Sequence, residues 1–340
     1  MHKLLVVGPS WVGDTVLTQP LLRLLRERRT DTEIHFLAPP WTAPLVQRMP
    51  EVAKVIVNPF GHGVLALIER YRFGRNLRPE QYDGCLVLPN SLKSALIPWL
   101  AGIPLRTGYQ GEMRYGLLND RRGLDAAALP QMVQRFAALG LGRNEALPEK
   151  LPSPRLTSSP EQQQAVAARL NLGTGVSPFV FCPGAEYGPA KRWPPEHFSL
   201  LARQLLDADQ CVWILGSPKD IAIADAINAG ADGRCFNLCG QTSLAEAVDL
   251  LAMARGVISN DSGLMHVAAA VGRPLIALYG SSSPVFTPPI SSQARVLSLT
   301  LECSPCFRRH CPLDHFRCMR DLTPAQVLAA LKESGMLHRA

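Results

Sequence analysis

The sequence predicts an α/β protein built from two doubly wound domains, and three observations support this fold class. Short apolar runs recur between helical segments in both halves, as expected for parallel strands that alternate with helices. The chain has 340 residues, 47% of them hydrophobic, which is enough for two domains with separate cores. A proline-rich segment lies between the halves. We therefore expect two Rossmann-like domains that face each other across a cleft.

The expected elements follow the chain in a regular order. Strand candidates in the first half are the apolar runs 3–7, 34–38, 54–58 and 85–89. The first helix is expected over residues 15–29, with its leucines facing the core and its arginines facing solvent. Strand candidates in the second half are residues 179–182, 212–216, 235–238, 256–259, 275–279 and 296–299. The linker is expected at residues 147–155, which hold three prolines.

Charge is distributed unevenly along the chain. Residues 1–150 carry 19 lysines and arginines against 13 acidic residues, whereas residues 151–340 carry 16 against 15. A basic first half suggests an anionic partner, such as an acidic lipid or a phosphorylated sugar, although a solvated basic surface has the same composition. Nucleic acid is not expected, because no basic run is interleaved with aromatic residues.

The chain contains neither an 18-residue apolar stretch nor an export signal at its N-terminus. Its nine cysteines are therefore expected to be thiols in a cytoplasmic protein.

The most informative segment is residues 258–269, an apolar strand followed by a polar turn and a helix. The helix is expected to begin at Asp261 or Ser262, and its free backbone N–H groups would attract an anion. Gly263 lets a ligand approach the backbone, and His266 lies one turn after Ser262. An ordinary capped helix has the same pattern, so both interpretations stay open on the residues alone.

Three other strand-to-helix turns carry residues suited to the same chemistry. Asp14 follows the first strand and could be a helix cap or a base, and its turn lacks the Gly-x-Gly-x-x-Gly spacing. Lys191 precedes a helix and would suit a phosphate clamp or an ordinary surface loop. Asp220 follows a strand, where a carboxylate could accept hydrogen bonds from a ribose.

Six segments, taken together, resemble the ADP-heptose–lipopolysaccharide heptosyltransferases. They are residues 8–14, 88–96, 102–120, 183–194, 259–270 and 277–284, of which the first, second and fourth resemble the type II members. The resemblance implies a GT-B fold, with an acceptor domain at 1–155 and an ADP-heptose domain at 156–322. It also implies that residues 323–340 form a C-terminal helix that packs back on the first domain, and Pro324 suits a helix start.

The implied reaction is an inverting transfer of L-glycero-D-manno-heptose from ADP-heptose to the first heptose of heptosyl-Kdo2-lipid A. The resemblance makes Asp14 the general base that accepts the proton of the attacking hydroxyl. It places the diphosphate at the helix start of the second domain, where growing negative charge needs hydrogen-bond donors. The donor-site candidates are Lys191, Asp220, Asp261, Ser262, Gly263 and His266.

The implied acceptor is an anionic lipid at the cytoplasmic face of the inner membrane, so we expect a peripheral enzyme. Acceptor-site candidates are Lys93, Arg106 and Arg114, which lie in the matching segments. The leucine- and arginine-rich residues 17–29 could rest on the membrane, but a core helix is favoured. No cofactor is expected, because ADP-heptose is a substrate.

A cysteine cluster near the C-terminus has a ligand-like spacing. It comprises Cys303, Cys306, Cys311 and Cys318, with His310 and His315 between them. A structural zinc site is one interpretation, but only one Cys-x-x-Cys pair is present, so free thiols are favoured.

Two other functions remain open. One is a nucleotide-sugar 2-epimerase of the same fold, and the other is a two-lobed sugar-binding protein without catalysis. Release of ADP that requires a lipid A acceptor would separate a heptosyltransferase from both.

Overall fold

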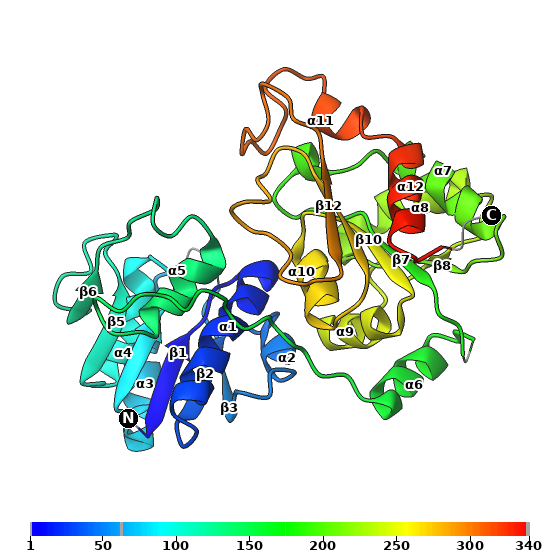
Figure 1. The fold of residues 1–340 in the computed structure, drawn as a ribbon. Helices are drawn as coiled ribbons and strands as arrows, with labels where there is room; N and C mark the ends of the chain where they lie inside the picture. The colour runs from blue at the N-terminus through cyan, green and yellow to red at the C-terminus, as the bar shows by residue number, and fades with distance from the viewer. Residues whose placement is uncertain (1, 62–63, 174, 338–340) are drawn as a thin grey trace. The chain divides into compact units, whose positions relative to one another are not determined.

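The computed structural model describes residues 2–61, 64–173 and 175–337. The chain consists of two compact units, Met1–Pro154 and Arg155–Ala340, drawn from blue to red in Figure 1. The division falls inside the proline-rich segment 147–155, one residue before the boundary expected from the sequence. Within the described ranges, no helix combines the length and the apolar character needed to cross a bilayer.

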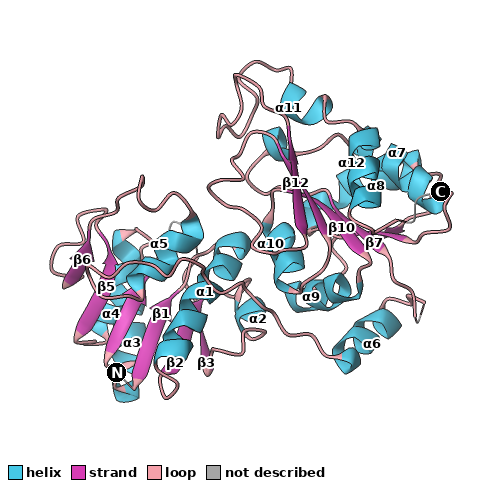
Figure 2. Cartoon of the chain, in the orientation of Figure 1, coloured by secondary structure: helices cyan, strands magenta, loops and turns pink. Residues whose placement is uncertain are grey.

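The first unit is a six-stranded parallel sheet in the order β3-β2-β1-β4-β5-β6, with helices packed on it (Figure 2). The direction of winding reverses between β1 and β4, which are hydrogen-bonded neighbours. Its elements are β1 (Lys3–Val7), α1 (Val12–Arg28), β2 (Glu33–Ala38), α2 (Ala43–Val46), β3 (Lys54–Val57), α3 (Leu67–Asn76), η1 (Arg78–Glu80), β4 (Gly84–Val87), α4 (Leu92–Leu100), β5 (Leu105–Tyr109), β6 (Asp120–Arg122) and α5 (Met132–Leu139).

The alternation of side chains along β1 explains how its sheet is covered on both faces. Leu5 and Val7 share one apolar cluster with Ala95 and Ile97 of α4. Leu4 and Val6 are also buried and point to the opposite face, because successive strand residues alternate.

Helix α1 begins at Val12, three residues before the expected start. Its residues Leu17, Leu21, Leu22 and Leu24 are buried. This confirms that α1 is a core helix, and its leucines are not a membrane-facing surface.

The second unit has the same winding, with a parallel sheet in the order β12-β11-β10-β7-β8-β9. Counted within this unit, β7 takes the place of β1 and β10 the place of β4, so the direction reverses between them. Its elements are α6 (Pro160–Arg169), β7 (Phe179–Cys182), η2 (Pro189–Lys191), α7 (Pro195–Leu206), β8 (Val212–Ile214), η3 (Pro218–Asp220), α8 (Ile221–Gly230), β9 (Phe236–Asn237), α9 (Leu244–Met253), β10 (Gly256–Asn260), α10 (Gly263–Ala270), β11 (Leu275–Tyr279), β12 (Ala294–Ser298), α11 (Arg317–Arg320) and α12 (Pro324–Glu333).

The C-terminal helix is part of the second unit. Residues 323–340 were predicted to form a helix that packs back on the first domain; α12 forms in this segment and packs against α7 and β11 of the second unit. Packing of this helix on the first unit stays a prediction. Its apolar residues Val327, Ala330 and Leu331 are buried in the same cluster as Phe198 and Phe179. The second unit thus uses this helix to cover its own sheet, and residues 338–340 lie outside the described range.

Two strands of the first unit were not predicted from the sequence. β5 contains Arg106 and Gly108, and β6 is the three-residue segment Asp-Arg-Arg. Neither has the continuous apolar character of a central parallel strand, because both lie toward the edge of the sheet.

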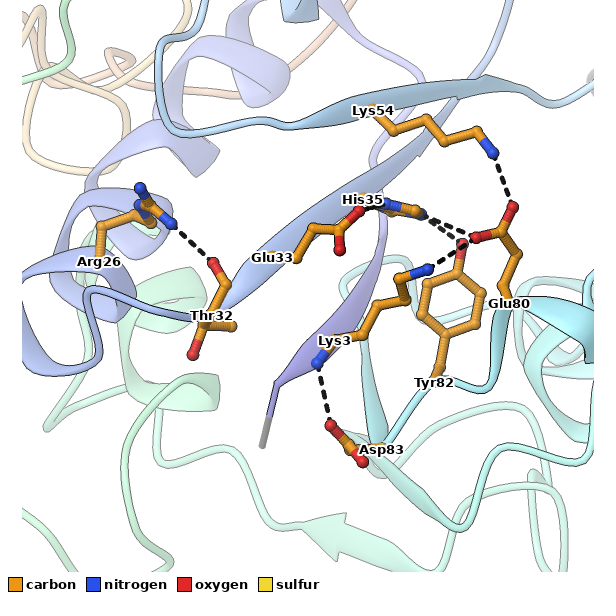
Figure 3. Close-up of polar contacts among 9 residues, drawn as sticks. All are labelled: Lys3, Arg26, Thr32, Glu33, His35, Lys54, Glu80, Tyr82 and Asp83. Carbon is orange, nitrogen blue, oxygen red and sulfur yellow. Dashed lines mark hydrogen bonds and ion pairs between the residues drawn. The ribbon is translucent and has the colours of Figure 1, made fainter.

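A polar network ties the amino ends of the first three strands together (Figure 3). Glu80, the last residue of η1, accepts hydrogen bonds from Lys3 at 2.9 Å and Lys54 at 2.6 Å. The buried His35 of β2 lies beside it and is hydrogen-bonded to Tyr82 at 2.8 Å. The two lysines hold the pKa of Glu80 at about 2, with Lys54 the larger cause. One carboxylate therefore joins β1 and β3 across the amino edge of the sheet.

We expect Glu80→Gln to destabilise the protein at neutral pH by about 1 kcal/mol, because both ion pairs are lost. The contribution of Glu80 is fully present above the ordinary carboxyl pKa of 4.5 and is lost as pH falls toward about 2. Urea unfolding of wild type and variant at pH 7 and pH 3 measures this, with the exposed Glu69→Gln as control. A difference in unfolding free energy that is equal at both pH values would contradict the assignment.

Candidate functional site

The turn after β10 leads directly into the first turn of α10. β10 is fully buried, Ser262 is the N-cap with extended backbone angles, and α10 begins at Gly263, later than expected. No side-chain hydrogen bond caps the helix, and the Ser262 hydroxyl lies 3.3 Å from that of Ser259. The first-turn N–H groups of α10, at the positive end of its dipole, are therefore suited to an anion.

Lys191 and Asp261 form an ion pair beside this turn. The Lys191 Nζ lies 2.6 Å from Asp261 Oδ2, and only 18% and 5% of the two side chains are exposed. Lys191 ends η2 in the segment after β7, and Asp261 directly follows β10. The pair thus lies at the carboxyl ends of the two strands between which the winding reverses, where open α/β sheets bind ligands. The structure gives Asp261 a partner in Lys191 and no capping role.

Asn260 is a site residue that the sequence reasoning missed. Its fully buried side chain donates to the carbonyl of Pro183 at 2.6 Å and accepts from the backbone N–H of Trp193 at 3.0 Å. Lys191 lies in the loop between Pro183 and Trp193. The Asn260 side chain therefore ties both ends of this loop to the end of β10. Its place within the Ser-Asn-Asp-Ser segment was visible in the sequence, but its partners 67 and 77 residues away were not.

His266 lies in α10, one turn after Ser262, and is 5% exposed. Its Nδ1 is buried and has no hydrogen-bond partner among the described residues. Burial lowers the pKa of His266 to about 4; the charge of Lys191 adds to the decrease, while that of Asp261 opposes it. The imidazole is therefore neutral at pH 7, so it can donate one hydrogen bond and accept another.

Two serines after β11 add polar groups at the same edge of the sheet. The hydroxyls of Ser281 and Ser282 are buried and have no hydrogen-bond partner in the described part of the chain. They follow the carboxyl end of β11, which pairs with β10. Buried hydroxyls without partners are rare, and such groups are suited to a polar ligand. Their segment, 277–284, matched the family resemblance, but neither serine was predicted as a site residue.

Asp220 is 8% exposed at the end of η3, and its carboxylate supports its own turn. Its Oδ2 accepts hydrogen bonds from the backbone N–H of Ser217 at 2.9 Å and from the Ser217 hydroxyl at 2.8 Å. Its Oδ1 lies 4.0 Å from the Arg192 guanidinium. A Cβ atom at Gly184 would lie only 2.5 Å from the carboxylate of Asp220. The loop after β7 therefore requires glycine at position 184.

The first unit presents its polar residues at the corresponding edge. Asp14 is the third residue of α1 and is half-buried; it is not the N-cap, which is Trp11. Lys93 is half-buried in the first turn of α4. The strands that precede these helices, β1 and β4, pair side by side, and Val7 faces Val87 in their register. Both residues therefore follow the carboxyl ends of the strands at the reversal of the first sheet.

Two exposed tryptophans at this edge were also not predicted. Trp11 follows β1 and is 47% exposed, and Trp41 follows β2 and is 46% exposed. The Trp41 indole donates to the carbonyl of Ser10 at 2.7 Å, which holds the two turns together. Their size and exposure were the available signal, since tryptophan is rarely left in solvent without a partner or ligand.

Arg106 lies in β5 and makes hydrogen bonds to the backbone around this strand. It is the second residue of β5, near the amino end of the strand and away from the carboxyl edge that holds Asp14. Its guanidinium donates to the carbonyls of Ile103 and Leu117, each at 2.6 Å. Arg106 therefore holds the backbone around β5, and its role in acceptor binding stays a prediction.

Arg114 is 2% exposed and holds the loop after β5. It donates to the carbonyl of Pro89 at 2.7 Å, to that of Tyr109 and to the side chain of Asn90. It also lines a pocket of about 170 Å³. The other residues that line this pocket are Gln110, Gly111, Glu112, Met113, Tyr115, Leu118 and Arg121.

The cysteine cluster surrounds one small pocket, together with His315. All nine cysteines are free, and Cys303 Sγ lies 4.0 Å from His315 Nε2. Burial, reinforced by neighbouring thiols, raises the pKa of Cys318 to about 11. Across residues 2–61, 64–173 and 175–337, no group of three His, Cys, Asp or Glu side chains has the geometry to hold a metal ion.

Two parallel sheets with the same winding define an α/β protein of the GT-B type. Residues 70–317 match the description Glycosyltransferase family 9 (heptosyltransferase). The chain is 46% identical to Lipopolysaccharide heptosyltransferase 2 of Escherichia coli (strain K12), with 97% of each covered. It is 46% identical to Lipooligosaccharide heptosyltransferase 2 of Haemophilus ducreyi, with 87% of this chain and 88% of the relative covered. The chain belongs to glycosyltransferase family 9, the heptosyltransferases.

Among solved structures, that of E. coli ADP-heptose lps heptosyltransferase II is similar, with a TM-score of 0.89 at 44% identity over 98% of both chains. A family 9 glycosyl transferase from Veillonella parvula shares the fold, with a TM-score of 0.82 at 20% identity over 98% of this chain and 97% of that one. These findings confirm the predicted fold class and the resemblance to type II heptosyltransferases. They favour neither the 2-epimerase nor the non-catalytic sugar-binding protein.

We expect the His266 imidazole to stay neutral from pH 8 down to pH 5. Its nitrogen resonances, identified by their loss in His266→Ala, should show no protonation in this interval, whereas those of the urea-unfolded protein should. Because the unfolded chain binds this proton near pH 6.5 and the native one near 4, the free energy of unfolding falls as pH drops between these values. Protonation of native His266 near pH 6.5 would contradict its burial.

Proposed function

We propose that this protein transfers L-glycero-D-manno-heptose from ADP-heptose to the first heptose of heptosyl-Kdo2-lipid A, with inversion at the anomeric carbon. One observation carries the proposal: a lysine held by an aspartate beside an uncapped helix N-terminus, at the reversal of the second sheet. The similarity to lipopolysaccharide heptosyltransferases 2, which extends over 97% of the chain, supports the same donor and acceptor.

The second unit supplies a cation and hydrogen-bond donors for the diphosphate of the departing ADP. Negative charge grows on the diphosphate as the bond to the sugar breaks, so preorganised donors aimed at it lower the barrier. Lys191 and the backbone N–H groups of Ser262 and Gly263 take this role, and neutral His266 donates a further hydrogen bond. Asp261 acts as a positioning residue, because its ion pair with Lys191 fixes the ammonium group beside the helix N-terminus.

The ribose is assigned to Asp220. The Oδ2 atom of this residue accepts two hydrogen bonds from Ser217, so Oδ1 is the oxygen that would accept a hydrogen bond from a ribose hydroxyl. Arg192 lies 4.0 Å from that oxygen. ADP-heptose is a substrate in this scheme, and the protein side chains themselves neutralise its diphosphate.

The first unit supplies the base and the acceptor site. Asp14 accepts the proton of the attacking hydroxyl as the new bond forms. Attack from the face opposite to the departing ADP inverts the anomeric carbon. Lys93, in the first turn of α4, and the pocket lined by Arg114 are the acceptor-site candidates. The acceptor is a membrane lipid, so we place the enzyme at the cytoplasmic face of the inner membrane as a peripheral protein.

The proposal is tested by measuring ADP release from ADP-heptose with and without heptosyl-Kdo2-lipid A. Asp14→Asn keeps the shape of the side chain but removes the base, so turnover should fall by roughly 10²–10⁴-fold while ADP affinity is unchanged. Asp31→Asn, the same change at an exposed position, is the control. Acceptor-independent ADP release by wild type would refute the transferase assignment, and wild-type turnover in Asp14→Asn would refute the base.

Lys191→Ala should weaken ADP binding by roughly tenfold, because a charged hydrogen bond to the diphosphate is lost. Isothermal titration measures this, and added salt should weaken the wild type more than the variant. Lys332→Ala, at an exposed position on α12, should bind ADP as the wild type does. If Lys191→Ala and His266→Ala both bind ADP with wild-type affinity, the diphosphate lies elsewhere.

A further inference from the structure

The first unit exposes a cluster of apolar side chains where the chain enters α3. We call it the α3 patch: Val64, Leu65, Leu67, Ile68 and Tyr71. Each of these side chains is between 46% and 64% exposed, although five apolar residues within eight positions would ordinarily be buried. Contiguous exposed apolar residues mark a binding surface, whereas single ones are common on any protein.

The patch is held in place by a buried arginine. Arg70 is only 3% exposed, and it donates to the carbonyl of Leu65 at 2.6 Å and to that of Val64 at 3.0 Å. Its guanidinium stacks on the ring of Phe60 at 4.1 Å from the ring centre. The backbone of the patch is thereby anchored to the unit while its apolar side chains remain in solvent.

The exposed face of α3 combines apolar and basic side chains. Gly74 packs against α4, where an added Cβ would lie 2.6 Å from that of Leu100, and Arg70 is buried on the same side. The exposed side chains of the helix are Leu67, Ile68, Glu69, Tyr71, Arg72, Arg75 and Asn76. Two of them, Arg72 and Arg75, are cationic, and Glu69 is the one acidic residue of α3.

The patch lies at the edge of the sheet that also carries Asp14. It follows the carboxyl end of β3, and β3 is two strands from β1 in the parallel sheet. Adjacent strands are about 4.8 Å apart, so the ends of β1 and β3 are about 10 Å apart. A surface that holds a lipid here would bring its sugar toward the proposed base.

We propose that the α3 patch is a membrane-docking surface, which inserts its apolar side chains shallowly into an anionic bilayer while Arg72 and Arg75 bind lipid phosphates. The proposal rests on the proposed function, in which the acceptor is a membrane lipid. Charge favours this occupant, because the two arginines outnumber the single acidic residue of α3, and residues 1–150 carry 19 lysines and arginines against 13 acidic residues. An apolar face with an excess of cations matches the boundary between acyl chains and anionic headgroups.

Sedimentation of the full chain with lipid vesicles tests the proposal. Vesicles of phosphatidylethanolamine and phosphatidylglycerol should bind the wild type, and phosphatidylcholine vesicles should bind it less. Leu67→Ser/Ile68→Ser should lower the partition coefficient on the anionic vesicles by roughly tenfold, because the inserted area is lost. Arg72→Gln/Arg75→Gln should lower it and weaken its salt dependence. Leu200→Ser/Val285→Ser, at exposed apolar positions of the second unit, should bind as the wild type does.

Transfer to a deacylated, water-soluble acceptor separates this proposal from the proposed function. Leu67→Ser/Ile68→Ser should retain wild-type turnover on that acceptor and lose turnover on vesicle-embedded lipid. Wild-type vesicle binding by this variant would overturn the docking surface, whatever the outcome of the transfer assay. A wild-type dimer that the variant loses, with vesicle binding unchanged, would overturn it in favour of a second copy. Absence of transfer by the wild type to either acceptor would instead refute the proposed function.

Discussion

The carboxyl edge of the second sheet depends on one buried amide, the side chain of Asn260. A buried amide must find partners for its donor and its acceptor, and both partners here belong to the backbone of the loop after β7. The loop has few regular backbone hydrogen bonds of its own, so the hydrogen bonds of the Asn260 side chain hold it in place. Trp193, fully buried beside it, completes the anchor by donating from its indole to the carbonyl of Leu322. Lys191 lies in the loop between the two anchored residues, Pro183 and Trp193.

The ion pair of Lys191 with Asp261 has an electrostatic reason. A lysine beside the positive end of α10 is repelled by the helix dipole and loses hydration through its burial. Asp261 offsets both effects with a single negative charge. A diphosphate at the same place would add further negative charge to a region that contains a cation, free N–H groups, unpaired hydroxyls and a neutral imidazole. The region is therefore arranged for an anion, and Asp261 keeps it stable when none is bound.

The sequence predicted the central strands of both sheets, because central parallel strands are continuous apolar runs and the polar residues after them stand out. Asp14, Lys191 and Asp261 became candidates in this way. The backbone contacts of Arg106 could not be predicted, since its partner carbonyls come together only in the folded unit. Asn260, Ser281 and Ser282 were missed for the same reason. Their significance lies in which partners they have or lack, and that depends on contacts between distant segments.

The packing of α12 within the second unit bears on how the protein can be divided experimentally. Because this helix closes the core over α7, a fragment from Arg155 onward retains every helix that covers the second sheet. Truncation before Pro324 would instead leave Phe198 and its neighbours open to solvent, which favours aggregation over folding. The second unit can thus be treated as a modular fragment for ligand screening, provided that its C-terminal helix is kept.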